Sequence, residues 1–245
     1  MKRRLITLIF SVLIVFVIAS PNIFANSLLD ALSLGLEKEI GYNTYHQIIA
    51  EKEVVQLPAE QQEWINSMFS KLANQSKRQN ELEYSLTVVK DDSVNAFALP
   101  AGYIFVNTGL LSYIQSDGEL AGVLAHEIAH VDRRHSMKAV TRAIGMNVLL
   151  GLIINKTDSK RKEQLAKIGV VAINLAQLGY SREAEFEADA YGVMFMKAAG
   201  YRKEELLDFW SRMEKDSGGG NSLAILQLFS THPPINERIK KIEAM

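Results

Sequence analysis

The chain has 245 residues, no cysteine, and nearly equal numbers of basic (27) and acidic (28) side chains. This length suits one sizeable catalytic domain and is short for two. The balanced charge gives no electrostatic reason to expect nucleic acid as a partner, and the lack of cysteine excludes disulfides, thiol catalysis, thiolate metal ligands and a lipid-modified cysteine.

Residues 1–25 are predicted to be an export signal. Three basic residues at 2–4 precede an uncharged apolar run of 15 residues, 5–19, and a candidate cleavage site follows Ala25. Because about 20 apolar residues are needed to span a bilayer, a cleaved signal is favoured over the alternative, an uncleaved membrane anchor. Residues 26–245 would then form a single exported domain in a bacterial periplasm, a location that is compatible with peripheral membrane association.

The next part of the chain combines a helical pattern with short β-prone pieces. Residues 58–73 have helical apolar spacing, through Trp64, Met68, Phe69 and Leu72. Strands are expected at 84–89, 96–99 and 103–106, the last two flanking a Pro-Ala-Gly turn.

From Ser116 onward the pattern is helical almost to the end. Ser116 and Glu119 form a capping box, so a helix is expected to begin there and to continue through residues 126–130. Two later apolar stretches, 143–155 and 168–178, are each under 15 residues long and are interrupted by asparagine. They are therefore expected to be buried helices rather than membrane spans.

The segment His126-Glu127-Ile128-Ala129-His130 matches the HExxH pattern of zinc peptidases. On a helix, His126 and His130 share one face, about 6 Å apart at Cβ, so that both imidazoles can bind one zinc ion. Glu127, one step round, can reach a metal-bound water and act as the catalytic base. His135 lies off this face and is expected to have a structural or supporting role.

A third zinc ligand is expected in the glutamate-rich segment 181–189. Glu185 lies about 200° round a helix from both Glu183 and Glu187, which are expected to form an ordinary solvated face. Glu185 shares its face with Asp189, which could orient a ligand histidine, and with Gly192. Such small residues, together with Gly122 on the HExxH helix, would let the two helices approach closely.

Four motifs together resemble the HtpX/BepA-like metallopeptidases, a family that includes the CAAX prenyl proteases and the Oma-type proteases. The motifs are NAFALPAGYIFVNTGLL, HEIAHVDRRH, YSREAEFEADAYG and STHPPINERI, in that order, from Asn95 to Ile239. The resemblance implies a gluzincin, with one zinc ion held by His126, His130 and Glu185 and with Glu127 catalytic. It also implies an α+β, mostly helical domain whose small mixed sheet has an edge strand bordering the active-site cleft. HtpX-like members have several membrane spans, and BepA-like members have a C-terminal repeat domain. This sequence has at most one membrane-spanning run and no tetratricopeptide-like repeat. The resemblance therefore does not imply that this chain recruits substrates as those relatives do.

The resemblance also places His232 near the metal. It could donate a hydrogen bond to the oxyanion of the reaction, or it could be a removable fourth ligand that keeps the enzyme latent. Arg238 matches the arginine that ends the last motif, and its partner cannot be read from the sequence.

The edge strand at Asn95, Ala96, Phe97 and Ala98 is expected to be a substrate platform. Such a strand can pair with an extended peptide through main-chain hydrogen bonds and largely ignore its side chains. The predicted function is therefore zinc-dependent hydrolysis of unfolded or misassembled cell-envelope proteins. The alternative is a latent or weakly active chaperone or assembly factor on the same fold.

Overall fold

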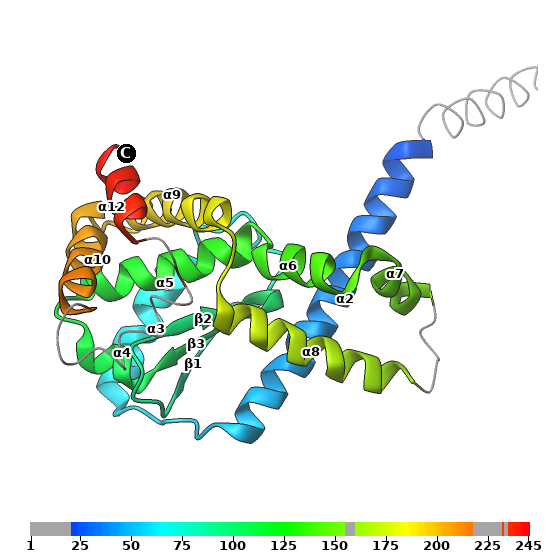
Figure 1. The fold of residues 1–245 in the computed structure, drawn as a ribbon, viewed down its shortest axis with the longest axis horizontal. Coiled ribbons are helices and arrows are strands. Elements are labelled where there is room, and N and C mark those ends of the chain that lie inside the picture. Colours follow the sequence, from blue (N-terminus) through cyan, green and yellow to red (C-terminus); the bar gives the residue numbers. More distant parts are fainter. Residues whose placement is uncertain (1–20, 155–159, 218–231, 233–234) are drawn as a thin grey trace, which may run out of the picture.

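The computed structural model describes residues 21–154, 160–217, 232 and 235–245. Within this part the chain is mostly helical and has one small sheet, which confirms the α+β expectation (Figure 1). The elements before the HExxH segment are α2 (Pro21–Glu51), α3 (Ala59–Ala73), β1 (Ser85–Val89), β2 (Ala96–Ala98), the 3-10 turn η1 (Pro100–Gly102), β3 (Tyr103–Asn107) and α4 (Thr108–Tyr113). The later elements are α5 (Asp117–Asp132), α6 (His135–Ile144), α7 (Met146–Ile154), α8 (Arg161–Leu178), α9 (Arg182–Ala198), α10 (Lys203–Ser217) and α12 (Ile235–Glu243).

The sheet has the order β1-β3-β2, with β1 parallel and β2 antiparallel to β3. All three expected strands are present. Along β2, Asn95 O accepts a bond from Asn107 N, and Leu99 N donates to Tyr103 O. Since hydrogen bonding alternates along an antiparallel strand, the main-chain groups of Ala96 and Ala98 point to the opposite edge.

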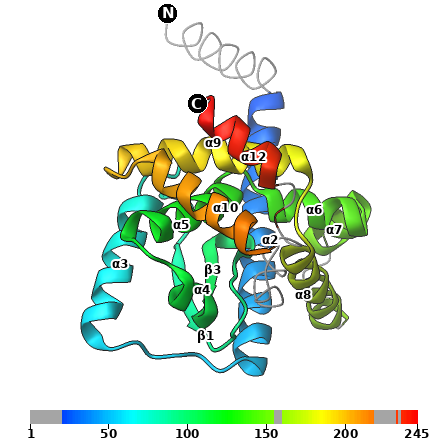
Figure 2. The same ribbon diagram turned by 60° about the vertical axis from the view of Figure 1, so that its left-hand side comes forward.

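Helix α5 is the centre of the fold, and every residue from Gly118 to Asp132 is buried. Its start follows the predicted cap: Ser116 accepts a bond from Glu119 N at 3.2 Å, and the Glu119 carboxylate accepts from Gln115 N. Because it is covered on all sides by α3, α9, α10 and β2, the helix holds its polar side chains away from bulk water (Figure 2).

Two glycines allow close packing against α5. A Cβ at Gly192 of α9 would lie 3.2 Å from the main-chain nitrogen of His126, so α9 crosses directly over the HExxH segment. Gly122 does not face α9 as expected. A Cβ there would lie 2.9 Å from Leu206 Cβ, so Gly122 admits α10 instead.

A second, smaller core lies at the other end of the molecule, where α6, α7 and α8 pack along α2 (Figure 1). A buried ion pair ties α2 to the main core, since Arg78 donates to both oxygens of Glu37 at 2.9 Å. Arg134 reaches the same carboxylate at 3.0 Å. The predicted export signal lies mostly in residues outside the described range.

The two apolar stretches are helical, but the expectation that they are buried is wrong in part. Helix α7 exposes four apolar side chains and α8 exposes two, namely Met146, Val148, Leu150, Ile154, Val170 and Leu178. In the described ranges no single helix has the length and apolar character of a membrane span; α6 and α7 meet that test only as a pair, which is bent by 99° at Gly145. In α3, Trp64 is also 37% exposed, and Ile65 takes the core position expected for it.

Candidate functional site

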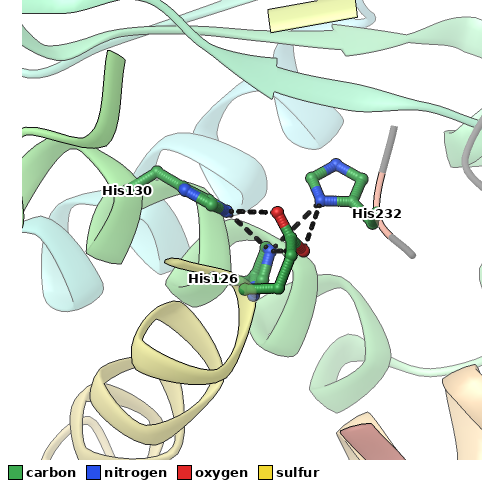
Figure 3. A group of neighbouring side chains, drawn as sticks. His126, His130 and His232 are labelled. Carbon is green, nitrogen blue, oxygen red and sulfur yellow. Dashed lines mark hydrogen bonds and ion pairs between the residues drawn. The ribbon is translucent and has the colours of Figure 1, made fainter. Parts of the chain in front are cut away.

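Four buried side chains from three separate parts of the chain meet at one point beside α5. His126 and His130 come from α5 and Glu185 from α9, while His232 precedes α12 (Figure 3). One donor atom from each lies within 4.8 Å of all the others. His130 Nε2 is 2.9 Å from His126 Nε2, and the Glu185 carboxylate oxygens lie 3.4 Å and 3.5 Å from these two nitrogens.

These donors suit a metal ion such as zinc. Glu185 Oε1, His232 Nε2 and Glu127 Oε2 are all buried and have no hydrogen-bond partner among the residues that the structure describes. A buried polar atom without a partner is unfavourable, and a bound cation with its water would satisfy a cluster of such acceptors. Two imidazoles and one carboxylate are one of the common ligand sets of a catalytic zinc site.

His126 is held by a carboxylate on the side away from the cluster. Asp189 Oδ1 lies 3.0 Å from His126 Nδ1, so that Nδ1 carries the proton and Nε2 is free to bind a metal. Asp189 is in turn held by Arg238, which donates to both of its oxygens at 2.7 Å and 2.6 Å. Although burial opposes ionisation, the Arg238 charge lowers the pKa of Asp189.

Arg238 has a wider role than the sequence could reveal. Its guanidinium also donates to His232 O at 3.1 Å, lies 3.3 Å from Glu185 Oε2, and stacks over the Trp210 ring at 4.1 Å. It therefore links the Asp189 carboxylate, the Glu185 carboxylate and the backbone of His232. The spacing of residues in the sequence indicates neither the position of Trp210 beside the site nor the contacts of Arg238.

His130 has a longer chain of support. His135 Nδ1 lies 2.9 Å from His130 Nδ1, and His135 Nε2 lies 3.0 Å from a Glu187 carboxylate oxygen. Since the carboxylate accepts from His135 Nε2, His135 Nδ1 can accept from His130 Nδ1, which leaves His130 Nε2 unprotonated. The supporting role expected for His135 thus has a geometric basis.

The expectation of a plain solvated face fails for Glu187. Its side chain is only 33% exposed, and it also accepts a bond from Arg133 at 2.7 Å. Helix α9 does point Glu187 away from Glu185, but α6 begins beside that other face and brings His135 to it. Glu183, by contrast, is exposed, as the sequence suggested.

The edge strand β2 reaches the site through one aromatic ring. Tyr180 stacks on His130, with ring centroids 4.4 Å apart, and its hydroxyl donates to Ala98 O at 3.3 Å. Ser136 contacts both the Tyr180 hydroxyl, at 2.7 Å, and Ala98 O, at 3.4 Å. Asn95, Ala96, Phe97 and Ala98 are all buried, with at most 3% of any of them exposed.

Glu127 lies beside the cluster but outside its set of four donor atoms. Its Oε1 is 3.6 Å from His232 Nε2. Burial raises the pKa of Glu127 above its usual value, although the nearby His232 and His126 act in the opposite direction. A buried carboxylate with one oxygen that has no hydrogen-bond partner in the described part of the chain is placed to accept a proton from a water in the cluster.

Charges within the cluster favour the metal-binding forms of two other residues. Burial, followed by repulsion from His126, lowers the pKa of His130 well below its usual value, which keeps its imidazole neutral. Burial opposes ionisation of Glu185, but His232, His126 and His130 together lower its pKa well below the ordinary value. A neutral imidazole and an ionised carboxylate are the forms that bind metals.

Comparison with known proteins identifies a family and several relatives. The model of "Peptidase family M48" matches residues 59–245, a range that contains every residue of the cluster. The chain is 32% identical over 216 residues to the mitochondrial metalloendopeptidase OMA1 of Schizosaccharomyces pombe, covering 86% of this chain and 61% of that protein. It is 30% identical over 173 residues to a putative beta-barrel assembly-enhancing protease of Vibrio cholerae, covering 64% of this chain and 33% of that protein.

A smaller relative is also similar. The metalloprotease YcaL of Escherichia coli is 30% identical over 164 residues, which cover 66% of this chain and 61% of that protein. The chain thus spans less than two thirds of the length of each of these three relatives.

Proposed function

The chain belongs to peptidase family M48, and we propose that it is a zinc metalloendopeptidase that cleaves unfolded or misassembled cell-envelope proteins. One observation carries the proposal: His126, His130 and Glu185 converge in a buried cluster, and Glu127 lies beside them with one oxygen that no described residue contacts by a hydrogen bond. A structural zinc site would have no need of that fourth group.

In this proposal His126, His130 and Glu185 hold one zinc ion per chain, and Asp189 orients His126. When bound, zinc would supply a Lewis acid that acidifies a water and polarises the scissile carbonyl. Glu127 accepts the proton of the attacking water and then passes it to the leaving amine. The closed environment of α5 excludes bulk water, which strengthens each of these electrostatic contacts.

His232 has two candidate roles. Its Nε2 has no hydrogen-bond partner within the described ranges and lies 3.6 Å from Glu127 Oε1, where it could donate to the oxyanion. Its Nδ1, however, lies 3.0 Å from Glu185 Oε2 and 3.3 Å from His126 Nε2, among the ligand atoms. The position of Nδ1 among the ligand atoms favours a latent form in which His232 would be a fourth metal ligand.

The substrate class rests on strand β2 and on the relatives. The edge of β2 that pairs with no strand in the described part of the chain could hold an extended main chain, which selects for unfolded segments rather than for one sequence. This pairing requires the covering side chains, including Tyr180, to move, because β2 is buried. The name of the Vibrio cholerae relative refers to beta-barrel assembly, which supports an envelope substrate.

Digestion of unfolded casein tests the function. Wild-type protein is expected to cleave casein, and a chelator is expected to abolish cleavage, with zinc restoring it. If wild type is inactive but His232→Ala cleaves in a chelator-sensitive way, the latent form is supported. Prevention of casein aggregation without cleavage by either protein would instead favour the chaperone alternative.

We propose export because residues 1–25 have the order of a signal peptide: basic residues, an apolar run and a candidate cleavage site. The mature protein is expected to begin at Asn26, because the cleavage site after Ala25 follows an apolar run too short to span a bilayer comfortably. N-terminal sequencing of protein recovered from the cell envelope measures this directly. Protein that retains Met1 and dissolves only in detergent would support the anchored alternative, and a mitochondrial location would agree with the OMA1 relative.

A further inference from the structure

A cavity of about 620 Å³ lies beside the second core, and none of its lining residues belongs to the metal cluster. It is open to the surface, is lined by residues of α2, α6 and α7, and has a mainly apolar wall, formed by Leu36, Met137, Met146, Leu149 and Ile153. A space of this size with an apolar wall suits part of an acyl chain or another apolar group.

The rim of this cavity is basic. Lys138 and Arg142 of α6 are four residues apart, so they lie on one face of the helix, and both are exposed. Neither side chain forms an ion pair with any carboxylate in the described ranges. Arg134, one turn earlier, also lines the cavity, but Glu37 compensates its charge at 3.0 Å. Two cations at the mouth of an apolar cavity are complementary to an anionic amphiphile.

Helix α7 extends the apolar surface outward from the cavity. Met146, Val148, Leu150 and Ile154 are between 37% and 76% exposed, while Leu149 and Leu152 hold the helix to the second core. The bend of 99° at Gly145 turns α7 away from the line of α6. A short helix with exposed apolar residues next to basic side chains is typical of elements that lie in the interfacial layer of a membrane.

We propose that the cavity and the exposed face of α7 bind an anionic phospholipid of a bilayer. Its acyl chain would enter between Leu36, Leu149 and Ile153, and its headgroup would contact Lys138 and Arg142. The apolar run 5–19 of the chain is a poorer occupant, because the basic residues 2–4 that precede it would meet the same two cations. This site does not depend on the peptidase activity.

Photo-crosslinking with the full chain tests the proposal. The probe is a phosphatidylglycerol with a diazirine in its acyl chain, carried in phosphatidylcholine vesicles that contain phosphatidylglycerol. Labelled peptides identified by mass spectrometry are expected to come from α2, α6 and α7. Vesicles in which the same diazirine is on phosphatidylcholine, with no anionic lipid, are expected to label these helices much less.

Charge variants make the test specific. K138Q/R142Q is expected to weaken labelling on the order of 30-fold at limiting lipid, from two lost contacts with an anionic surface. The matched control K71Q/K197Q removes two exposed lysines of α3 and α9 and should label like wild type. V148N/I154N, which alters only exposed side chains of α7, should also reduce labelling, and thermal unfolding checks that all three variants are folded.

Three results would overturn the proposal. Equal labelling from neutral vesicles would show apolar contact without headgroup recognition. An equal loss in both pairs of charge variants would show only a general effect of net charge. Labelling confined to residues 1–20 would show that the N-terminal run alone contacts the lipid.

Discussion

Replacement of Glu127 by Gln is expected to lower the rate of casein cleavage at least a hundredfold while zinc stays bound. General-base catalysis typically contributes about 10²–10⁴-fold, and the amide cannot accept the proton of the attacking water. The nearly isosteric side chain keeps the buried position, and Glu127 is not among the four clustered donors, so thermal stability should stay near that of wild type. Cleavage rate, bound zinc and unfolding temperature are the three measurements.

The matched control is Glu183→Gln, which makes the same chemical change at an exposed position of α9. It should cleave at the wild-type rate. A Glu127→Gln protein that binds zinc and cleaves as fast as this control would show that another group is the base. If His232 keeps wild type latent, the comparison is made in the His232→Ala background, where the same ratio is expected.

Loss of zinc binding should be graded across four positions. Glu185→Gln is expected to reduce zinc affinity most, because it replaces a proposed ligand that is completely buried among histidines. His135→Ala and Glu187→Gln should each reduce it by about 10–100-fold, the usual effect of removing a partner of a metal-binding histidine. Glu183→Gln should leave it unchanged. Competition with a fluorescent chelator measures all four affinities.

The order of the four zinc affinities distinguishes two explanations of the role of Glu187 in α9. If only the helix face matters, Glu187→Gln should behave like Glu183→Gln. If the contacts from Glu187 through His135 to His130 hold the imidazole in place, Glu187→Gln should behave like His135→Ala, and the double variant should show less than the sum of the two losses. Equal affinity for all four variants would rule out Glu185 as a ligand.

The sequence predicted which side chains share a face where they belong to one helix. The interval from His126 to His130 and the angle between Glu185 and Glu187 are both properties of a single α-helix, as is the Ser116 cap. The three strands were also predicted correctly from their short β-prone pieces.

Contacts between elements could not be predicted in this way. Arg238 reaches Asp189 from α12, and Glu187 meets His135 because α6 starts beside α9. Both side chains are long, so the face from which they leave the helix does not fix what they touch. Likewise, apolar composition alone could not show that α7 turns several of its side chains outward.

The order of the residues along the chain determines how much of it must be present before the metal cluster can form. His232 follows His126 by 106 residues and Arg238 follows it by 112, yet both contact the core of the cluster. Without Arg238, Asp189 lacks its guanidinium partner, and the carboxylate beside His126 is no longer held in place. A nascent chain that has folded only as far as α10 therefore contains the HExxH helix without a complete catalytic centre. Assembly of the centre thus requires nearly all of the residues that the structure describes.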